Sequence, residues 1–149
     1  MSSDIEQLAA IEEIKKLKAR YFRCMDTKNW AGLAAVFSDD AEFDMRGEAA
    51  DKSKAATDII VGGAGIASFI RSAVETVVTV HHGHMPEIAL TSPTTARGIW
   101  AMEDVLRWPE GGPVKALHGY GHYHETYRLT DEGWRIQSSR LSRLRVDIT

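Results

Sequence analysis

Residues 95–129 read TARGIWAMEDVLRWPEGGPVKALHGYGHYHETYRL, and their pattern determines the class of fold. On both sides of the Pro- and Gly-rich turn at 109–113, the residue pattern repeats with a period of two, which is typical of β-strands. The same pattern predicts four strands, over 87–91, 95–108, 114–129 and 134–148. Turns this short join antiparallel neighbours, because a parallel return needs a crossover of about a dozen residues or more. The second half of the chain is therefore predicted to form an antiparallel meander.

The first segment carries the signals of a long helix. Ser3 and Glu6 have the spacing of a capping box. Apolar residues then recur every three or four positions, which is the period of one helix face. This stripe consists of Ile5, Leu8, Ile11, Ile14, Leu17, Tyr21 and Cys24. The basic residues that lie outside the stripe are interpreted as a solvated face; they are Lys15, Lys16, Lys18 and Arg20.

The remaining elements of the first half are shorter. Asn29 is a suitable cap for a second helix, because its side chain can accept a backbone hydrogen bond. The predicted elements are a helix over 30–37, a strand over 41–46, a loop over 47–57 and a third helix over 59–80 that follows the glycines at 62–65.

Helices followed by a meander predict an α+β fold, and we expect one domain over residues 1–149. Long strands joined by tight turns twist and coil. A curved sheet covered on its concave face by the first helix encloses a pocket. Gly98, Gly119 and Gly121 suit bulges or bends that tighten the curve.

Composition narrows the class of function. The chain has 149 residues and a net charge of −3, which argues against non-specific nucleic-acid binding. Cys24 is the single cysteine, so no intrachain disulfide forms, and we expect a reducing, cytoplasmic location. We expect neither a signal peptide nor a stretch that spans a bilayer. The expected partner is a small apolar organic molecule, without nucleic acid or membrane.

All six histidines lie between positions 81 and 124, and histidine is the side chain best suited to proton transfer near neutral pH. His81, His82 and His84 lie between the predicted third helix and the next strand, near the pocket. The other three, His118, His122 and His124, share one strand face. That face predicts either a metal pair, His122 and His124 joined by His81 or His84, or a subunit interface. No strong metal motif occurs, so we expect neither metal nor cofactor.

Two carboxylates stand out by their position. Asp104 shares a strand face with Trp100 and Met102, and a buried carboxylate needs a partner. A histidine would serve, whereas an Asp104 at a strand end would meet water or an arginine. Asp26 ends the first helix, where the helix dipole disfavours a negative charge. It is either functional or a turn-forming residue. Tyr21, on the buried stripe, needs a partner for its hydroxyl.

Several segments together resemble a known family. They are the Tyr-Phe-Arg-Cys-Met-Asp stretch at 21–26 with the helix before it, Phe-Ser-Asp-Asp-Ala at 37–41, the His-x-x-His-x-Pro-Glu-Ile stretch at 81–88 and Trp-Arg-Ile at 134–136. The chain resembles the SnoaL-like proteins of the nuclear transport factor 2-like superfamily, most closely the bile-acid 7α-dehydratases and scytalone dehydratase-like proteins. This resemblance implies a cone-shaped α+β barrel of three helices and a strongly curved, mostly antiparallel sheet around an apolar pocket.

The resemblance also implies site residues. The catalytic candidates are Tyr21, Asp26, His81 and Asp104. The candidates for substrate binding are Phe43, Phe69, Trp100, Met102, Tyr123 and Arg143. The hypothesis is that His81, held by Asp104, removes a proton next to an activating group. Tyr21 then assists the enolate oxygen or the leaving hydroxyl, and Asp26 orients Tyr21 or protonates the departing group.

This hypothesis describes a hydro-lyase that dehydrates a polycyclic, steroid-like or polyketide-like substrate. The alternatives are a ketosteroid-isomerase-like isomerase, a non-catalytic protein that binds hydrophobic ligands, and a structural subunit like the small subunit of ring-hydroxylating dioxygenases. Relatives associate through the open face of the sheet, so we expect a homo-oligomer, and a trimer rather than a dimer.

Overall fold

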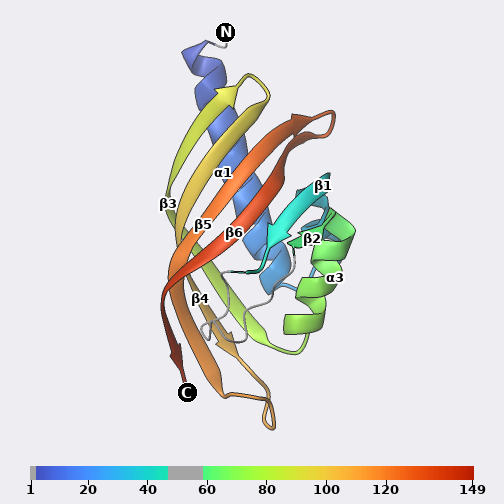
Figure 1. Ribbon diagram of the computed structural model, residues 1–149, viewed down its shortest axis with the longest axis vertical. Coiled ribbons are helices and arrows are strands. Elements are labelled where there is room, and N and C mark those ends of the chain that lie inside the picture. Colours follow the sequence, from blue (N-terminus) through green and yellow to red (C-terminus); the bar gives the residue numbers. More distant parts are fainter. Residues whose placement is uncertain (1–2, 47–58) are drawn as a thin grey trace.

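The chain is described by a computed structural model that covers residues 3–46 and 59–149, and it has the predicted α+β order (Figure 1). The predicted loop at 47–57 lies outside the described residues. The helices are α1 (Asp4–Asp26), α2 (Trp30–Ala35) and α3 (Gly63–Val74). The strands are β1 (Phe37–Asp44), β2 (Ile59–Val61), β3 (Val78–Ser92), β4 (Thr95–Arg107), β5 (Ala116–Thr130) and β6 (Gly133–Ile148).

The strands form one sheet in the order β2-β1-β6-β5-β4-β3. The run from β3 to β6 is the predicted antiparallel meander. The mostly antiparallel sheet forms as expected, and its one parallel contact lies between β1 and β6. No tight turn joins these two strands, so their relative direction is not constrained by a short connection.

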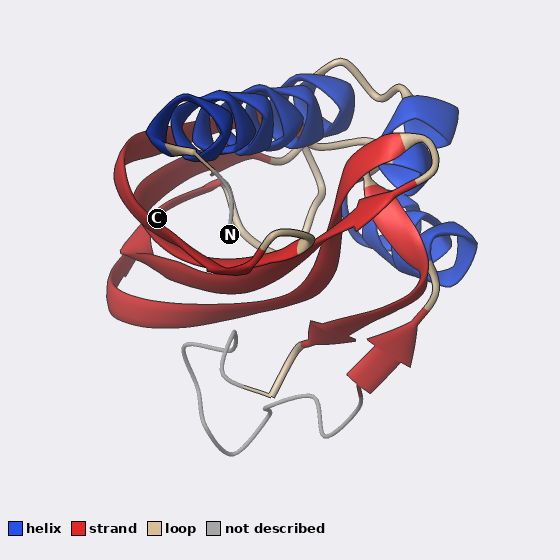
Figure 2. Cartoon of the chain, turned by 90° about the horizontal axis from the view of Figure 1, so that it is seen from above, coloured by secondary structure: helices blue, strands red, loops and turns tan. Residues whose placement is uncertain are grey.

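Helix α1 lies across the concave side of the curved sheet (Figure 2) and packs against β3 and β6. Its start is the predicted capping box, in which the Ser3 hydroxyl accepts from the Glu6 N–H and the Glu6 carboxylate accepts from the Ser3 N–H. The middle of the stripe is buried as predicted, with Ile14 and Leu17 fully enclosed. The first turns are not, since Ile5 is 80% exposed and Leu8 66% exposed.

The third predicted helix is too long at both ends. Residues 59–61 form β2 instead, and α3 begins after Gly62, whose φ of 85° is accessible to glycine. The helix ends at Val74, and β3 starts at Val78. His81, His82 and His84 therefore lie on a strand and not in a loop.

The position of β3 explains why the sequence pattern predicts only its second part, residues 87–91. Within residues 3–46 and 59–149 it is the last strand of the sheet and pairs only with β4, so one of its edges has no partner strand there. Pro86 has no N–H to donate, and edge strands accommodate proline. The register with β4 shifts between Gly83 and Pro86. A strand of this kind needs neither continuous pairing nor regular alternation of apolar residues.

The connection between α1 and β1 is tight. Lys28 has a φ of 62°, and the Asn29 side chain caps α2 as predicted by accepting from the Gly32 N–H at 2.9 Å. Helix α2 ends at Ala35, and β1 begins at Phe37, four residues before the predicted strand start at 41. Among the described residues, no helix is long and apolar enough to cross a bilayer.

Candidate active site

His81 is fixed by the last residue of α1. Its ring Nδ1 lies 2.7 Å from Asp26 Oδ1, and its backbone N–H donates to Asp26 Oδ2 at 2.8 Å. One carboxylate thus holds both the backbone and the ring of the same residue. Because a carboxylate accepts hydrogen bonds, this contact places the imidazole proton on Nδ1 and leaves the lone pair on Nε2. That is the tautomer in which Nε2 can accept a proton.

Asp26 is held in its ionised form by further donors. The Thr79 hydroxyl donates to Asp26 Oδ1 at 2.9 Å, and Lys28 Nζ donates to the Thr79 hydroxyl at 3.1 Å. Burial raises the pKa of the Asp26 carboxyl, but hydrogen bonds from His81 and Thr79 outweigh it, so the pKa lies below its usual value. Burial lowers the pKa of Lys28, and the negative charge of Asp26 opposes that shift.

Asp104 lies on the other side of the His81 ring. Its Oδ2 is 3.9 Å from Nε2, and the two residues face each other across the β3–β4 ladder. Arg143 from β6 donates to both oxygens of Asp104, at 2.6 and 3.0 Å. The shortest contact to the His81 ring thus comes from Asp26 at 2.7 Å, whereas Asp104, the expected partner of His81, lies at 3.9 Å and is bound by Arg143. The arginine partner that was the alternative for Asp104 is present as well.

A glycine makes the Asp104–Arg143 pair possible. A Cβ atom at Gly119 would collide with the Arg143 guanidinium and the Asp104 carboxylate. The register between β5 and β6 also shifts between Tyr120 and Gly121, as expected for a bend in the strand. The pair is well enclosed, since the Asp104 side chain is 5% exposed.

Aromatic rings connect His81 to the helix. Phe22 stacks on the His81 ring at a centroid distance of 6.1 Å and an interplanar angle of 16°. The same Phe22 ring lies 5.5 Å from that of Tyr21 and 5.9 Å from that of Tyr123. Tyr21 and Tyr123 are themselves buried. The predicted catalytic tyrosine thus belongs to the aromatic cluster that covers His81.

The remaining predicted residues divide into two groups. Trp100 and Met102 are buried on the inward face of β4, which also carries Asp104. Phe43 is buried against Phe37, at a ring distance of 6.3 Å. Phe69 is not brought to the site, because it is 37% exposed on α3, whose buried residues are Ile66, Ala67 and Ile70.

Sequence reasoning missed a buried ion pair beside this cluster. Lys18 was expected on a solvated face, but its side chain is fully buried and its Nζ lies 2.8 Å from Glu125 Oε2. The signal was available: Lys18 follows Ile14 by four residues and precedes Tyr21 by three, which places it on the buried side of α1. Glu125 occupies an inward position on β5 between Tyr123 and Tyr127.

The other histidines lie on the outer face of the sheet. Glu103 accepts from His118 Nε2 at 3.0 Å, and ring nitrogens of His82 and His84 lie 3.5 and 3.6 Å from its Oε1. The hydrogen bond from His118, followed by that from His82, lowers the pKa of the Glu103 carboxyl. Within residues 3–46 and 59–149, no group of three or more His, Cys, Asp or Glu side chains is arranged to bind a metal ion.

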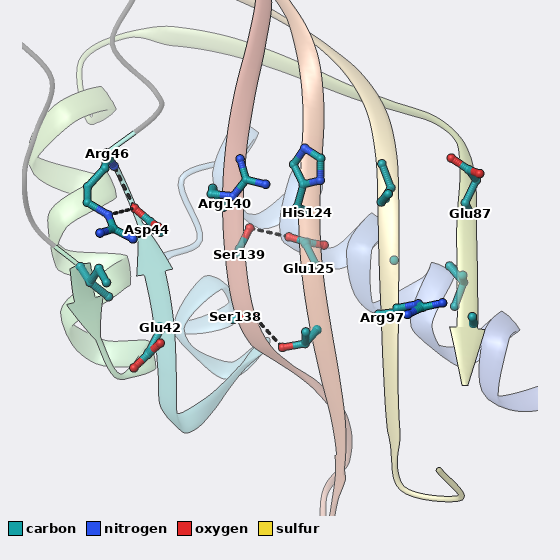
Figure 3. Close-up of a pocket in the computed structure, with 16 residues that line it drawn as sticks. Glu42, Asp44, Arg46, Glu87, Arg97, His124, Glu125, Ser138, Ser139 and Arg140 are labelled. Atoms are coloured by element: carbon teal, nitrogen blue, oxygen red, sulfur yellow. Dashed lines mark hydrogen bonds and ion pairs between the residues drawn. The ribbon is translucent and has the colours of Figure 1, made fainter. Parts of the chain in front are cut away.

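The outer face also carries a hollow of about 830 Å³ (Figure 3). Its lining includes charged side chains from several strands, among them Arg97 and Arg140, which are exposed. None of the predicted catalytic residues lines it. The His81 group therefore lies apart from this hollow, on the inward side of the sheet.

Comparison with known proteins identifies the family of the chain. The family model of the SnoaL-like domain matches residues 6–140. A protein from Gibberella zeae named a probable cyclase is 26% identical over 144 residues, which cover 88% of this chain and 89% of that protein.

Solved structures share the fold. Hexachlorocyclohexane dehydrochlorinase LinA-type3 from Novosphingobium barchaimii LL02 has a TM-score of 0.82 at 19% identity, over 99% of this chain and 94% of that one. A protein from Novosphingobium aromaticivorans DSM 12444 with the provisional name scytalone dehydratase has a TM-score of 0.81 at 19% identity, over 95% and 89% of the two chains. With its curved mixed sheet and covering helices, the chain belongs to the SnoaL-like domain family of the nuclear transport factor 2-like superfamily.

Proposed function

We propose that the chain is a lyase that eliminates water from a hydroxylated apolar molecule of the polycyclic, steroid-like or polyketide-like class. The observation that carries the proposal is the contact between Asp26 and His81 Nδ1 at 2.7 Å. It directs the Nε2 lone pair to the side of the ring where Asp104 and Arg143 lie. A histidine oriented in this way by a carboxylate is a general base.

The proposed reaction begins at a carbon next to a carbonyl group. His81 Nε2 takes the proton from this carbon, and the electron pair of the C–H bond forms the new double bond as the C–O bond to the hydroxyl group breaks. Tyr21 supplies a proton to the departing hydroxyl group, which leaves as water. The imidazolium that forms on His81 is stabilised by the negative charge of Asp26 and returns its proton to solvent, while the Tyr21 phenolate is reprotonated.

The surrounding residues give the substrate its expected chemistry. Phe22 offers apolar surface next to His81, and the buried Trp100 and Met102 share the inward face of β4 with Asp104, which is paired with Arg143. The proposal assigns every step to side chains of the chain and includes no metal or organic cofactor. Its reaction class is supported by two structural neighbours whose names denote eliminations, a dehydrochlorinase and a dehydratase.

The test is a screen of hydroxylated steroids and polycyclic ketones with mass spectrometry of the products. Wild-type protein is expected to release a product lighter by one water. His81→Ala is expected to lower turnover by about 10²–10⁴-fold, the usual contribution of a positioned base. The matched control is His82→Ala, because His82 is the next residue on β3 and its side chain is 58% exposed. That variant should retain the wild-type rate.

The other functions give different results in the same screen. An isomerase would yield a product of unchanged mass that incorporates deuterium from D₂O. A binding protein would retain the ligand without converting it. Near wild-type turnover by His81→Ala on the true substrate would refute the assignment of the base.

A further inference from the structure

Lys18 carries an ammonium group into the interior of the molecule. Its Nζ lies 3.6 Å from the centre of the Tyr123 ring, 3.9 Å from that of Tyr21 and 4.9 Å from that of Phe22. A cation over the face of an aromatic ring is attracted by the electron density of that face. The three rings are those that connect α1 with His81, so the buried charge lies directly behind the proposed site.

Glu125 is held as the counterion by several donors. Its Oε2 accepts from Lys18 Nζ at 2.8 Å and from the Ser139 hydroxyl at 2.6 Å, and its Oε1 accepts from the Tyr127 hydroxyl at 2.9 Å. Tyr127 in turn accepts from Trp100 Nε1 at 2.8 Å. Donors of this kind stabilise a carboxylate relative to the neutral acid. The ammonium therefore has a carboxyl partner that is held at a fixed position.

A gain in folding stability does not by itself explain the burial of the Lys18–Glu125 pair. Burial removes both charges from water and lowers the pKa of Lys18, although Glu125 opposes that shift. Replacement of buried ion pairs by apolar residues of similar volume is often neutral or stabilising. A buried ion pair beside the proposed reacting group therefore points to a role in the site.

We propose that Lys18 is a positioning residue that fixes the rings of Tyr21 and Tyr123 and makes the Tyr21 hydroxyl a stronger proton donor. This inference rests on the proposed role of Tyr21 as the acid. A phenol that gives up its proton leaves negative charge delocalised over its ring. The ammonium over the ring face stabilises that charge more than it stabilises the neutral phenol, because opposite charges at this distance attract strongly inside a protein.

The experiment measures the acidity of Tyr21 without any substrate. The protein is labelled with 3,5-difluorotyrosine, whose phenol ionises near neutral pH and can therefore be titrated without strongly alkaline conditions. The chain has four tyrosines, and Tyr21→Phe identifies the ¹⁹F signal of Tyr21. In Lys18→Met/Glu125→Gln both charges are removed together, and the pKa of the labelled Tyr21 phenol is expected to rise by about one unit or more.

The matched control is the exposed pair Lys16–Glu13 on the same helix, whose side chains are 58% and 56% exposed. Lys16→Met/Glu13→Gln should leave the Tyr21 titration unchanged. Lys18→Arg keeps a cation over the rings, so the pKa of its labelled Tyr21 phenol should stay close to the wild-type value. Once a substrate is known, the charge-free variant should lower kcat by about tenfold with little change in KM.

Three results would overturn the inference. One is a folded Lys18→Met/Glu125→Gln variant in which the Tyr21 pKa is unchanged, even if its melting temperature falls. Another is a Lys18→Arg variant that titrates like the charge-free protein. The third is failure of both this double variant and Lys18→Gln/Glu125→Gln to fold, which would make the pair a requirement of folding itself. Because the titration needs no turnover, its outcome is separate from that of the lyase screen.

Discussion

Asp26 decides which nitrogen of His81 carries the proton, and one atom of its side chain is enough to reverse that choice. In Asp26→Asn the amide can donate to Nδ1, which favours the tautomer with the proton on Nε2. In that tautomer, Nε2 on the Asp104 side of the ring has no lone pair with which to accept a proton. Turnover is therefore expected to fall by about 10²–10⁴-fold, although the fold and substrate binding persist. Steady-state kinetics with a thermal unfolding curve would check this, and an unchanged kcat would contradict it.

The same carboxyl group makes stability depend on pH. The pKa of Asp26 is lowered in the folded chain, so the folded state is favoured above the ordinary carboxyl pKa of about 3.9, and this contribution is lost as the pH falls through the lower folded value. Asp26→Asn should therefore lose stability near neutral pH and show a shallower decline in acid. Urea unfolding from about pH 6 to pH 3 measures both curves. Parallel curves would rule out the contribution.

Residue chemistry predicted which side chains gather at the site but not all of their partners. Asp26 and Asp104 stood out by their positions and Tyr21 by its place on the buried stripe, whereas His81 was chosen among six histidines through the family resemblance. Two carboxylates reach the His81 ring from different elements, and which of them bonds to Nδ1 depends on where α1 ends relative to β3. Lys18 was missed because a lysine near a stripe is usually solvated.

Strand β5 needs a glycine at position 119, because a side chain there would collide with its neighbours. Gly119→Ala places a methyl group against Asp104 and Arg143, and it should cost about 1–3 kcal/mol of unfolding free energy together with most of the activity. Gly65→Ala on α3 is the control, because only a side-chain carbon of Ile60 lies near, at 3.8 Å. It should be neutral or stabilising by up to about 1 kcal/mol. Equal losses in the two variants would refute this account.

Element prediction succeeded where local patterns are strong. The capping box at Ser3 and the alternation in β4 and β5 are local signals, and their elements form as predicted. Residues 59–61 and the start of β3 are held by pairing with β1 and β4, and this tertiary pairing overrides the apolar spacing that favoured a continuous helix. The parallel contact of β1 with β6 is likewise a long-range property with no local signal.

For the whole molecule, the pair Lys18–Glu125 joins α1 to the sheet across 107 positions of the chain. Lys18→Met alone leaves the Glu125 carboxylate buried without its cation and should cost about 3–5 kcal/mol. Lys18→Met/Glu125→Gln should recover a large part of that loss, because no uncompensated charge remains. Urea unfolding of the two variants gives the comparison, and a double variant less stable than the single one would contradict the charge explanation.

The α+β class and the curved sheet followed from the order and period of the segments, whereas the assembly state stays a proposal. We propose a homo-oligomer, with a trimer favoured over a dimer, and light scattering gives its mass directly. The exposed charged residues on the outer face, including Arg97 and Arg140, are the first to mutate in a test of whether subunits associate there.

The free edge of β3 has a further consequence for how the molecule loses activity. A strand paired on one side can detach in a local fluctuation while the strands behind it stay hydrogen-bonded. Such an opening would separate His81 from Asp104 and from Asp26 without melting the core. Catalytic competence should therefore vanish at lower denaturant concentration than the global transition, and the amides of β3 should exchange with D₂O sooner than those of β5.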